Sequence, residues 1–117
     1  MFDVQVRKIA DSTVVTPSGE LDLSGARALS PVLADVAADG ASRVVLDLRD
    51  LTFLDSSGIG TIVKFQRHFA VEGVGFGVVK GDEHVQRAFA LSHVEPLMPW
   101  TMPPGDADPD PQVRRRP

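Results

Sequence analysis

The chain has 117 residues, with 12 Lys and Arg against 16 Asp and Glu, a formal net charge of −4 and no cysteine. This length suits one domain, and a composition of 43% apolar and 24% charged residues is close to the globular average, so global disorder is not expected. The missing cysteines exclude disulfides, thiolate catalysis and cysteine-ligated zinc, and they fit a cytoplasmic location. The histidines, His68, His84 and His93, are too far apart in sequence for local metal-ligand spacing.

Three further classes of function are disfavoured. No apolar run approaches the roughly 20 residues that a membrane span needs, so we expect no membrane partner. The mildly acidic balance argues against a nucleic-acid surface. No arrangement of Ser, His and Asp for nucleophilic catalysis is evident, so we expect a protein that is not an enzyme and uses no cofactor.

The first predicted elements are two strands. Apolar alternation over residues 4–9 indicates the first strand, and it resumes at residues 14–15 after a turn near Asp11 and Ser12. Pro17 has no N–H to donate, so we expect it to end the second strand or to lie on an open edge of the sheet.

Helices and short apolar runs alternate from there on. Helical spacing predicts helices from Ser24 to Asp39, from Ser56 or Ser57 to about residue 70, and from His84 to Leu91. Strands are predicted at residues 43–48, 76–79 and 97–100, the last of them weak. Pro31 implies either a kink in the first helix or a helix start at Ser30. This order indicates an α/β fold with a mixed, mostly parallel sheet of four to five strands and three or more helices.

The composition changes near residue 103. The segment 103–117 holds five of the nine prolines, an acidic run at Asp106, Asp108 and Asp110, and the basic run Arg114 to Arg116. We therefore predict a folded domain over residues 1–102 and a disordered tail over 103–117.

The segment Asp55-Ser56-Ser57-Gly58 lies where an apolar run enters the second helix. Asp and Ser are preferred helix N-caps, so capping alone is one explanation of the segment. A hydroxyl at the positive end of a helix is also a plausible phosphate acceptor, because the helix dipole tolerates the added negative charge. Asp22 precedes the first helix in the corresponding way, and it shares a surface with Ser56 if the second strand and residues 43–48 are parallel neighbours.

These segments together carry a resemblance to a known family. Gly19-Glu20-Leu21-Asp22, the run Val44 to Leu48, and Leu51 to Gly60 stand in an order that resembles the STAS domain, and within it the anti-sigma factor antagonists. The resemblance covers roughly residues 3 to 100. It implies the fold of that family, although the closing helix that members usually carry is not legible in the proline-rich C-terminal region.

The resemblance also implies a function. In that family the serine after the motif aspartate accepts a phosphate, which here is Ser56, with Ser57 as the alternative. The unphosphorylated protein binds an anti-sigma factor that is an ATP-dependent serine kinase, and so frees a sigma factor for transcription. Phosphorylation separates the pair, and a phosphoserine phosphatase resets it. The protein itself is expected to be a monomer or a weak homodimer. The predicted partner surface comprises Asp22, Asp55, Ser56, Ser57, Gly58, Thr61 and Phe65.

Phe65 allows two interpretations. At about 100° per residue it lies at the margin of the apolar face formed by Ile59, Ile62, Val63 and Phe69, while Thr61 and His68 point away from that face. It is therefore either peripheral core or an exposed aromatic anchor for a partner.

Other functions stay open at this point. A STAS scaffold or a regulatory subunit in a stress-signalling or transporter complex is a closer alternative. A response-regulator-like domain phosphorylated on Asp55 is a more distant one, because the first strand offers no paired acids for the magnesium that such chemistry needs. The glycine-rich segment 73–77 follows a helix and enters a strand, the reverse of a dinucleotide-binding fingerprint.

Overall fold

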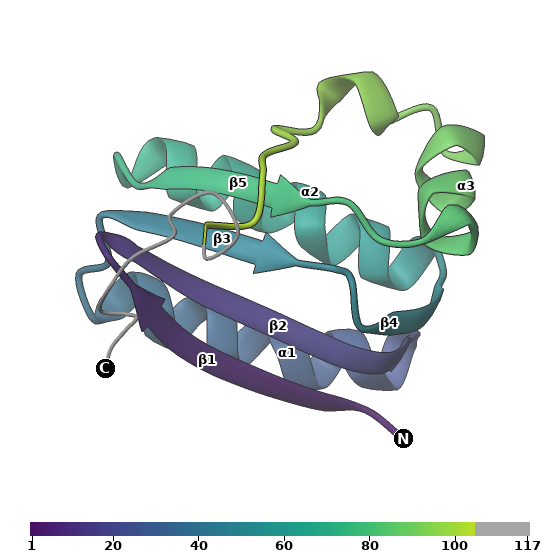
Figure 1. Cartoon of the computed structure of the whole chain (residues 1–117), viewed down its shortest axis with the longest axis horizontal. Coiled ribbons are helices and arrows are strands. Elements are labelled where there is room, and N and C mark those ends of the chain that lie inside the picture. The colour runs from purple at the N-terminus through teal and green to yellow at the C-terminus, as the bar shows by residue number, and fades with distance from the viewer. Residues whose placement is uncertain (105–117) are drawn as a thin grey trace.

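The computed structural model describes residues 1–104 as a five-stranded sheet with three α-helices (Figure 1). The strands are β1 (Asp3–Ile9), β2 (Ser12–Leu21), β3 (Arg43–Asp47), β4 (Leu51–Leu54) and β5 (Gly75–Val79). The helices are α1 (Leu23–Ala38), α2 (Ser56–Val71) and α3 (Glu83–Leu91), and η1 (Glu95–Leu97) is a short 3-10 helix. The predicted α/β class with a mixed sheet is confirmed.

The sheet has the order β1-β2-β3-β5, and β4 pairs with the far end of β2. β1 and β2 are antiparallel, and every other strand pair is parallel. The chain reverses between β1 and β2 through Ala10, whose φ of 53° is left-handed. The predicted opening hairpin is therefore confirmed, and the second strand and residues 43–48 are parallel neighbours, which was the condition for a surface shared by Asp22 and Ser56.

α1 and α2 lie together behind one face of the sheet, while α3 lies beside β4 (Figure 1). The main core fills the space between this face and the helices, and its largest buried side chains include Phe69 and Phe89, both 0% exposed. A smaller apolar cluster of Val14, Val45 and Val79 lies on the opposite face. Burying apolar surface at roughly 25 cal/mol per Å² makes this main core the chief source of stability.

Pro17 does not end β2. It is buried in the middle of the strand and stands opposite Val4 of β1. On the other side of β2, the pairing with β3 stops at Val15 and the pairing with β4 starts at Gly19. Pro17 therefore occupies a gap between two parallel partners, where a missing N–H costs no ladder bond.

β4 was not predicted as a strand. Its four residues pair in parallel with the end of β2, with a register shift at Gly19 and Glu20. The strand is too short to show an alternating pattern, so only the pairing with β2 defines it.

The helix boundaries agree with the predicted ones to within a residue. α1 starts at Leu23 and runs past Pro31, so a start at Ser30 is wrong. An interior proline costs about 3 kcal/mol, and the buried Leu29 and Leu33 on either side of it offset that cost. α1 ends at Ala38 with Asp39 as its C-cap, and Gly40 follows at φ 81°, as expected for a glycine after a helix.

The predicted strand at residues 97–100 is wrong. The segment contains the end of η1, and only Trp100 forms an isolated parallel bridge, with Val78. Pro96 and Pro99 lack the N–H groups that a continuous ladder requires. Trp100 instead packs edge-on against Phe89, with ring centroids 5.1 Å apart, and its indole N–H donates to the Glu95 carbonyl.

Among residues 1–104, no helix has the length and apolar character needed to cross a bilayer. The predicted tail lies outside the described residues from position 105 onward.

Candidate functional site

The ends of β2 and β4 bring the two aspartate segments together. Leu21 and Leu54, the last residues of these strands, are paired, and the N–H of Asp55 donates to the Leu21 carbonyl at 3.3 Å. Asp22 and Asp55 therefore follow two neighbouring strands at the same edge of the sheet. The expectation that these loops share a surface rested on β3 alone, whereas β4 supplies the direct link.

Asp55 is the N-cap of α2. Its Oδ1 accepts hydrogen bonds from the backbone N–H of Ser57 at 2.9 Å and of Gly58 at 3.3 Å. The capping interpretation therefore holds for Asp55. A phosphoryl group on either oxygen of Asp55 would turn the carboxylate into an acyl phosphate and remove the ionised acceptor that the two N–H groups bind, so the cap disfavours modification there.

Ser56 is the first residue of α2 and is exposed to solvent. Within residues 1–104 its hydroxyl takes part in no hydrogen bond, so neither burial nor a competing partner blocks it. The following Ser57 is only half-exposed. At the positive end of the helix dipole, the negative charge of a phosphate on Ser56 would be favoured.

Asp22 caps α1 in the same manner. Its Oδ1 accepts a hydrogen bond from the N–H of Gly25 at 3.0 Å. The two acidic caps give the edge a negative character, to which exposed Glu20 adds a third carboxylate. The N-terminal ammonium lies 2.7 Å from Glu20 Oε1 and lowers the pKa of this carboxyl by its hydrogen bond and its charge.

Gly58 has a packing role. It is buried, and a Cβ at this position would come within 2.6 Å of Leu54 Cδ1 and 2.8 Å of the Leu21 carbonyl oxygen. The first turn of α2 therefore rests directly on the ends of β2 and β4. The glycine is needed for this close approach, and its burial removes it from the surface that a partner reaches.

Phe65 belongs to the core. It is 4% exposed and packs near Phe69, with ring centroids 5.9 Å apart. The interpretation as peripheral core is confirmed, and the exposed anchor is wrong because the margin of the apolar face turns inward here. Thr61 is half-buried, and its hydroxyl donates to the Ser57 carbonyl, which stabilises the first turns of α2.

Two exposed apolar side chains near the site were missed by the sequence analysis. Leu23, the first residue of α1, is 52% exposed, and Phe53 in β4 is 47% exposed. Each lies within three positions of a capping aspartate. Phe53 stands in an apolar run and Leu23 directly before the predicted helix, and no sequence signal separates these two from their buried neighbours.

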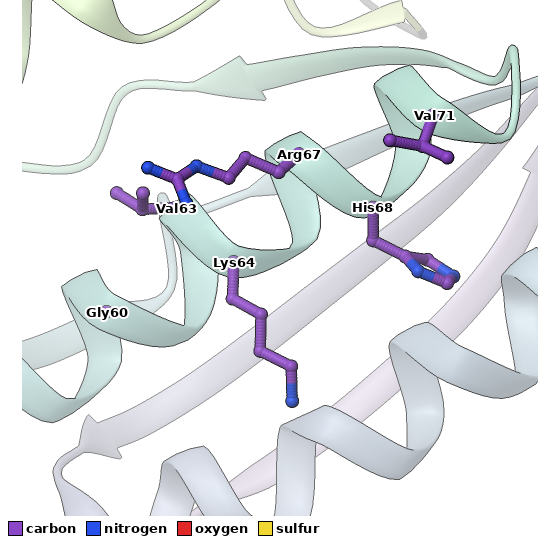
Figure 2. A pocket seen from close by; sticks show the side chains of 6 residues that line it. All are labelled: Gly60, Val63, Lys64, Arg67, His68 and Val71. Atoms are coloured by element: carbon purple, nitrogen blue, oxygen red, sulfur yellow. The ribbon is translucent and has the colours of Figure 1, made fainter.

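A shallow hollow runs along the outer side of α2, one turn beyond Ser56 (Figure 2). In Figure 2 the side chains of Lys64 and His68 extend toward α1, whereas Arg67 and Val63 lie on the other side of α2. Lys64, Arg67 and His68 give the hollow a basic lining, which contrasts with the carboxylates at the start of the helix. The hollow does not include Ser56, so it is separate from the candidate site.

Across residues 1–104 there is no group of three or more His, Asp or Glu side chains arranged to hold a metal ion. The candidate site consists of the exposed Ser56 hydroxyl, two capping carboxylates and their apolar neighbours.

Comparison with known proteins identifies the family. A family model described as Mlab, STAS domain matches residues 4–99. The chain belongs to the STAS domain family. The match runs from the second residue of β1 to beyond η1 and includes both aspartate segments.

Relatives of this STAS domain are regulators. A Thermotoga maritima protein whose name describes it as an anti-sigma factor antagonist is 27% identical over 93 residues, which cover 78% of this chain and 82% of that protein. The crystal structure of an anti-sigma factor antagonist from Mycobacterium paratuberculosis is 29% identical, with a TM-score of 0.81, and covers 92% of this chain and 91% of the other. The anti-sigma factor antagonist SpoIIAA in its unphosphorylated form shares the fold, with a TM-score of 0.74 at 21% identity and 96% coverage of both chains.

Proposed function

We propose that this protein is a cytoplasmic anti-sigma factor antagonist that is switched off by phosphorylation of Ser56. In the unphosphorylated state it binds an anti-sigma factor that is also an ATP-dependent serine kinase, and a sigma factor is thereby released. A phosphoserine phosphatase returns the protein to the binding state. The observation that carries the proposal is the exposed, unbonded Ser56 hydroxyl at the first position of α2, beside two capping aspartates.

The geometry favours Ser56 over its neighbours as the acceptor. In the transfer, Ser56 Oγ forms a bond to the γ-phosphorus of ATP, the bond to ADP breaks, and the hydroxyl proton passes to a base of the kinase. Ser57 is half-buried and one position deeper in the helix, so an enzyme reaches it less readily. Asp55 is engaged in capping, which disfavours an acyl phosphate there.

The phosphate changes the surface without damaging the fold. It adds about −1.5 to −2 charge at pH 7 next to the N–H groups of the first turn, where negative charge is favourable. In the complex with the kinase, the new phosphate lies beside the ADP that donated it, so like charges meet in a desolvated interface. Each 1.4 kcal/mol of lost binding free energy weakens the complex about tenfold, so a penalty of about 3 kcal/mol suffices for release.

The rest of the proposed partner surface follows from exposure. Asp22, Asp55, Ser57 and Thr61 are half-exposed and surround Ser56 on the first turns of α1 and α2. The exposed Leu23 and Phe53 add apolar contact area at the same edge. Gly58 and Phe65 are left out of this surface because both are buried.

The test is a pull-down from the source cells with and without ATP, followed by mass spectrometry of the partners and the phosphosite. The wild type is expected to bring down a serine kinase and to release it when ATP is added. Ser56→Ala should retain the kinase in ATP, and Ser56→Asp should bind it weakly from the start.

Ser57→Ala serves as the matched control and should behave like the wild type. Release and phosphorylation of Ser56→Ala in ATP would contradict the assignment. Loss of both in Ser57→Ala would move the acceptor to Ser57.

A further inference from the structure

β1 is an open edge of the sheet. It is the first strand in the order β1-β2-β3-β5 and pairs only with β2, along its whole length. Figure 1 shows it on the outer border of the sheet, with nothing from the labelled elements beyond it. The opposite border is different, because Val78 of β5 pairs with Trp100 and donates its N–H to the Pro99 carbonyl. An edge strand of this length offers the backbone donors and acceptors of its open side to another strand.

The side chains of β1 fall into two sets. Val4 and Val6 point toward the helices, where Val4 packs on the core and Val6 lines a shallow groove beside Val36 of α1. Val6 is nevertheless 48% exposed. Asp3, Gln5 and Arg7 alternate with these valines and are exposed, so they lie on the opposite face. Within residues 1–104 the side chains of Asp3 and Arg7 form no ion pair.

We propose that β1 pairs with β1 of a second copy of this chain, in antiparallel orientation and in one particular register. With Gln5 opposite Gln5 on the twofold axis, Asp3 of each copy stands opposite Arg7 of the other. In the same register Val4 stands opposite Val6. The strand is therefore complementary to itself, with two ion pairs on one face and two valine pairs on the other.

Neighbouring registers lack this complementarity. A shift of two residues one way sets Val6 opposite Val6 and Lys8 opposite Val4, and Arg7 then faces Gln5. The opposite shift sets Asp3 opposite Gln5. A shift of one residue places the valines of one copy on the polar face of the other. Opposite-charge and apolar cross-strand pairs each contribute roughly 0.2–1 kcal/mol, so the difference between registers is cumulative.

The dimer would be weak and would leave the candidate site free. An interface limited to one strand and its flanking side chains is smaller than the roughly 1,200 Å² of a stable complex, so we expect a dissociation constant on the order of 10–100 μM. The twofold axis runs through Gln5, whereas Ser56 lies after β4, at the end of the sheet. The two Ser56 side chains therefore lie away from the axis, and dimer formation does not depend on the proposed phosphorylation.

Sedimentation equilibrium over about 5 μM to 1 mM tests the proposal. Arg7→Glu is expected to weaken the dimer by about tenfold or more, because the new carboxylate then faces Asp3 of the other copy in both pairs. Asp3→Arg should weaken it similarly, since it sets two guanidinium groups against each other in each pair. The double variant with both changes should recover the wild-type affinity, and a mixture of the two single variants should form a heterodimer tighter than either homodimer.

Arg87→Glu, an equal charge change on the exposed side of α3, is the matched control and should leave the affinity unchanged. Circular dichroism checks that each variant is folded. A chain that stays monomeric at about 1 mM, or a dimer that Arg7→Glu does not weaken, would overturn the proposal.

Cross-linking tests the register independently. The chain has no cysteine, so a single introduced thiol reports one position. Gln5→Cys should form a disulfide-linked dimer on mild oxidation, since the two Cβ atoms lie about 5 Å apart across the axis. Lys8→Cys should not, because its two thiols lie roughly 20 Å apart along the strands. Equal cross-linking of both variants would refute the register.

Discussion

The N-termini of α1 and α2 are built alike and differ at one position that matters. Both follow a strand that ends in leucine, and both have an aspartate N-cap that accepts a hydrogen bond from a glycine N–H three residues later. The aligned segments are Leu21-Asp22-Leu23-Ser24-Gly25 and Leu54-Asp55-Ser56-Ser57-Gly58. The first helical residue is exposed in both, and it is leucine in one and serine in the other.

This comparison separates the residues that the fold requires from those that it does not. Both glycines are buried where a Cβ would collide with a strand carbonyl, that of Glu20 for Gly25 and that of Leu21 for Gly58. The aspartates and glycines thus serve the same structural purpose twice. Since α1 forms with Leu23 at the first position, a serine there is not needed to start such a helix. Ser56 is therefore the residue of its segment that the fold does not require, as the phosphorylation proposed above needs.

The largest expected effect comes from filling the space under a helix start. Gly58→Ala should lower the free energy of unfolding by about 2 to 4 kcal/mol, because the Leu21 carbonyl oxygen 2.8 Å away is backbone and cannot give way easily. Gly25→Ala should behave similarly, as the Glu20 carbonyl oxygen is 2.6 Å away. Urea unfolding measures both.

Gly60→Ala is the control for these variants. It lies in the same helix, and a Cβ there meets nothing within 4 Å. This change should raise the free energy of unfolding by up to about 1 kcal/mol through helix propensity. Equal tolerance of alanine at positions 58 and 60 would show that the close packing is unimportant.

A smaller effect is expected from removing a cap. Asp55→Ala should cost about 1 kcal/mol of unfolding free energy, and Asp22→Ala somewhat less, because Asp55 satisfies two backbone N–H groups and Asp22 one. Asp→Asn at either position should retain most of the stability, as asparagine caps about as well. A larger loss of unfolding free energy in Asp22→Ala than in Asp55→Ala would contradict this comparison of the two helix N-termini.

A stabilising effect is expected from negative charge at the first helical position. Ser56→Asp should raise the free energy of unfolding by about 0.3–1 kcal/mol at low salt, through the helix dipole. Leu23→Asp should give a similar gain if the two termini are equivalent. The gains should shrink with added salt. A clear loss of stability in Ser56→Asp would mean that the fold does not tolerate the modification we propose.

The smallest effect concerns Glu20, the residue before Leu21 at the end of β2. Its pKa is lowered from 4.5 by the N-terminal ammonium, so the pairing stabilises the fold above the ordinary carboxyl pKa. This contribution is lost as the pH falls through the lowered value. An NMR titration of the Glu20 side-chain carboxyl should show a midpoint below 4.5. A midpoint at or above that value would exclude the ion pair in solution.

Much of the candidate site followed from local sequence. Asp55 and Ser56 mark a helix start through the known preference for caps, and the apolar spacing after them predicts the helix itself. The stop of α1 before Gly40 was likewise legible from residue types. These inferences succeed because each depends on interactions within one turn or one element.

The tertiary structure decided the rest, because the sequence of one segment does not reveal which distant segment it pairs with. Pro17 is tolerated inside β2 only because the pairing of β2 with β3 stops before it and the pairing with β4 starts after it. Phe65 turns inward because Phe69 and the sheet receive it, although its helical position alone is marginal. The sequence by itself determined that a capped helix presents a serine; the parallel pairing of Leu21 with Leu54 decided that two acidic caps stand beside each other at one edge. This pairing is formed by backbone hydrogen bonds, and such bonds do not depend on a recognisable pattern of side chains.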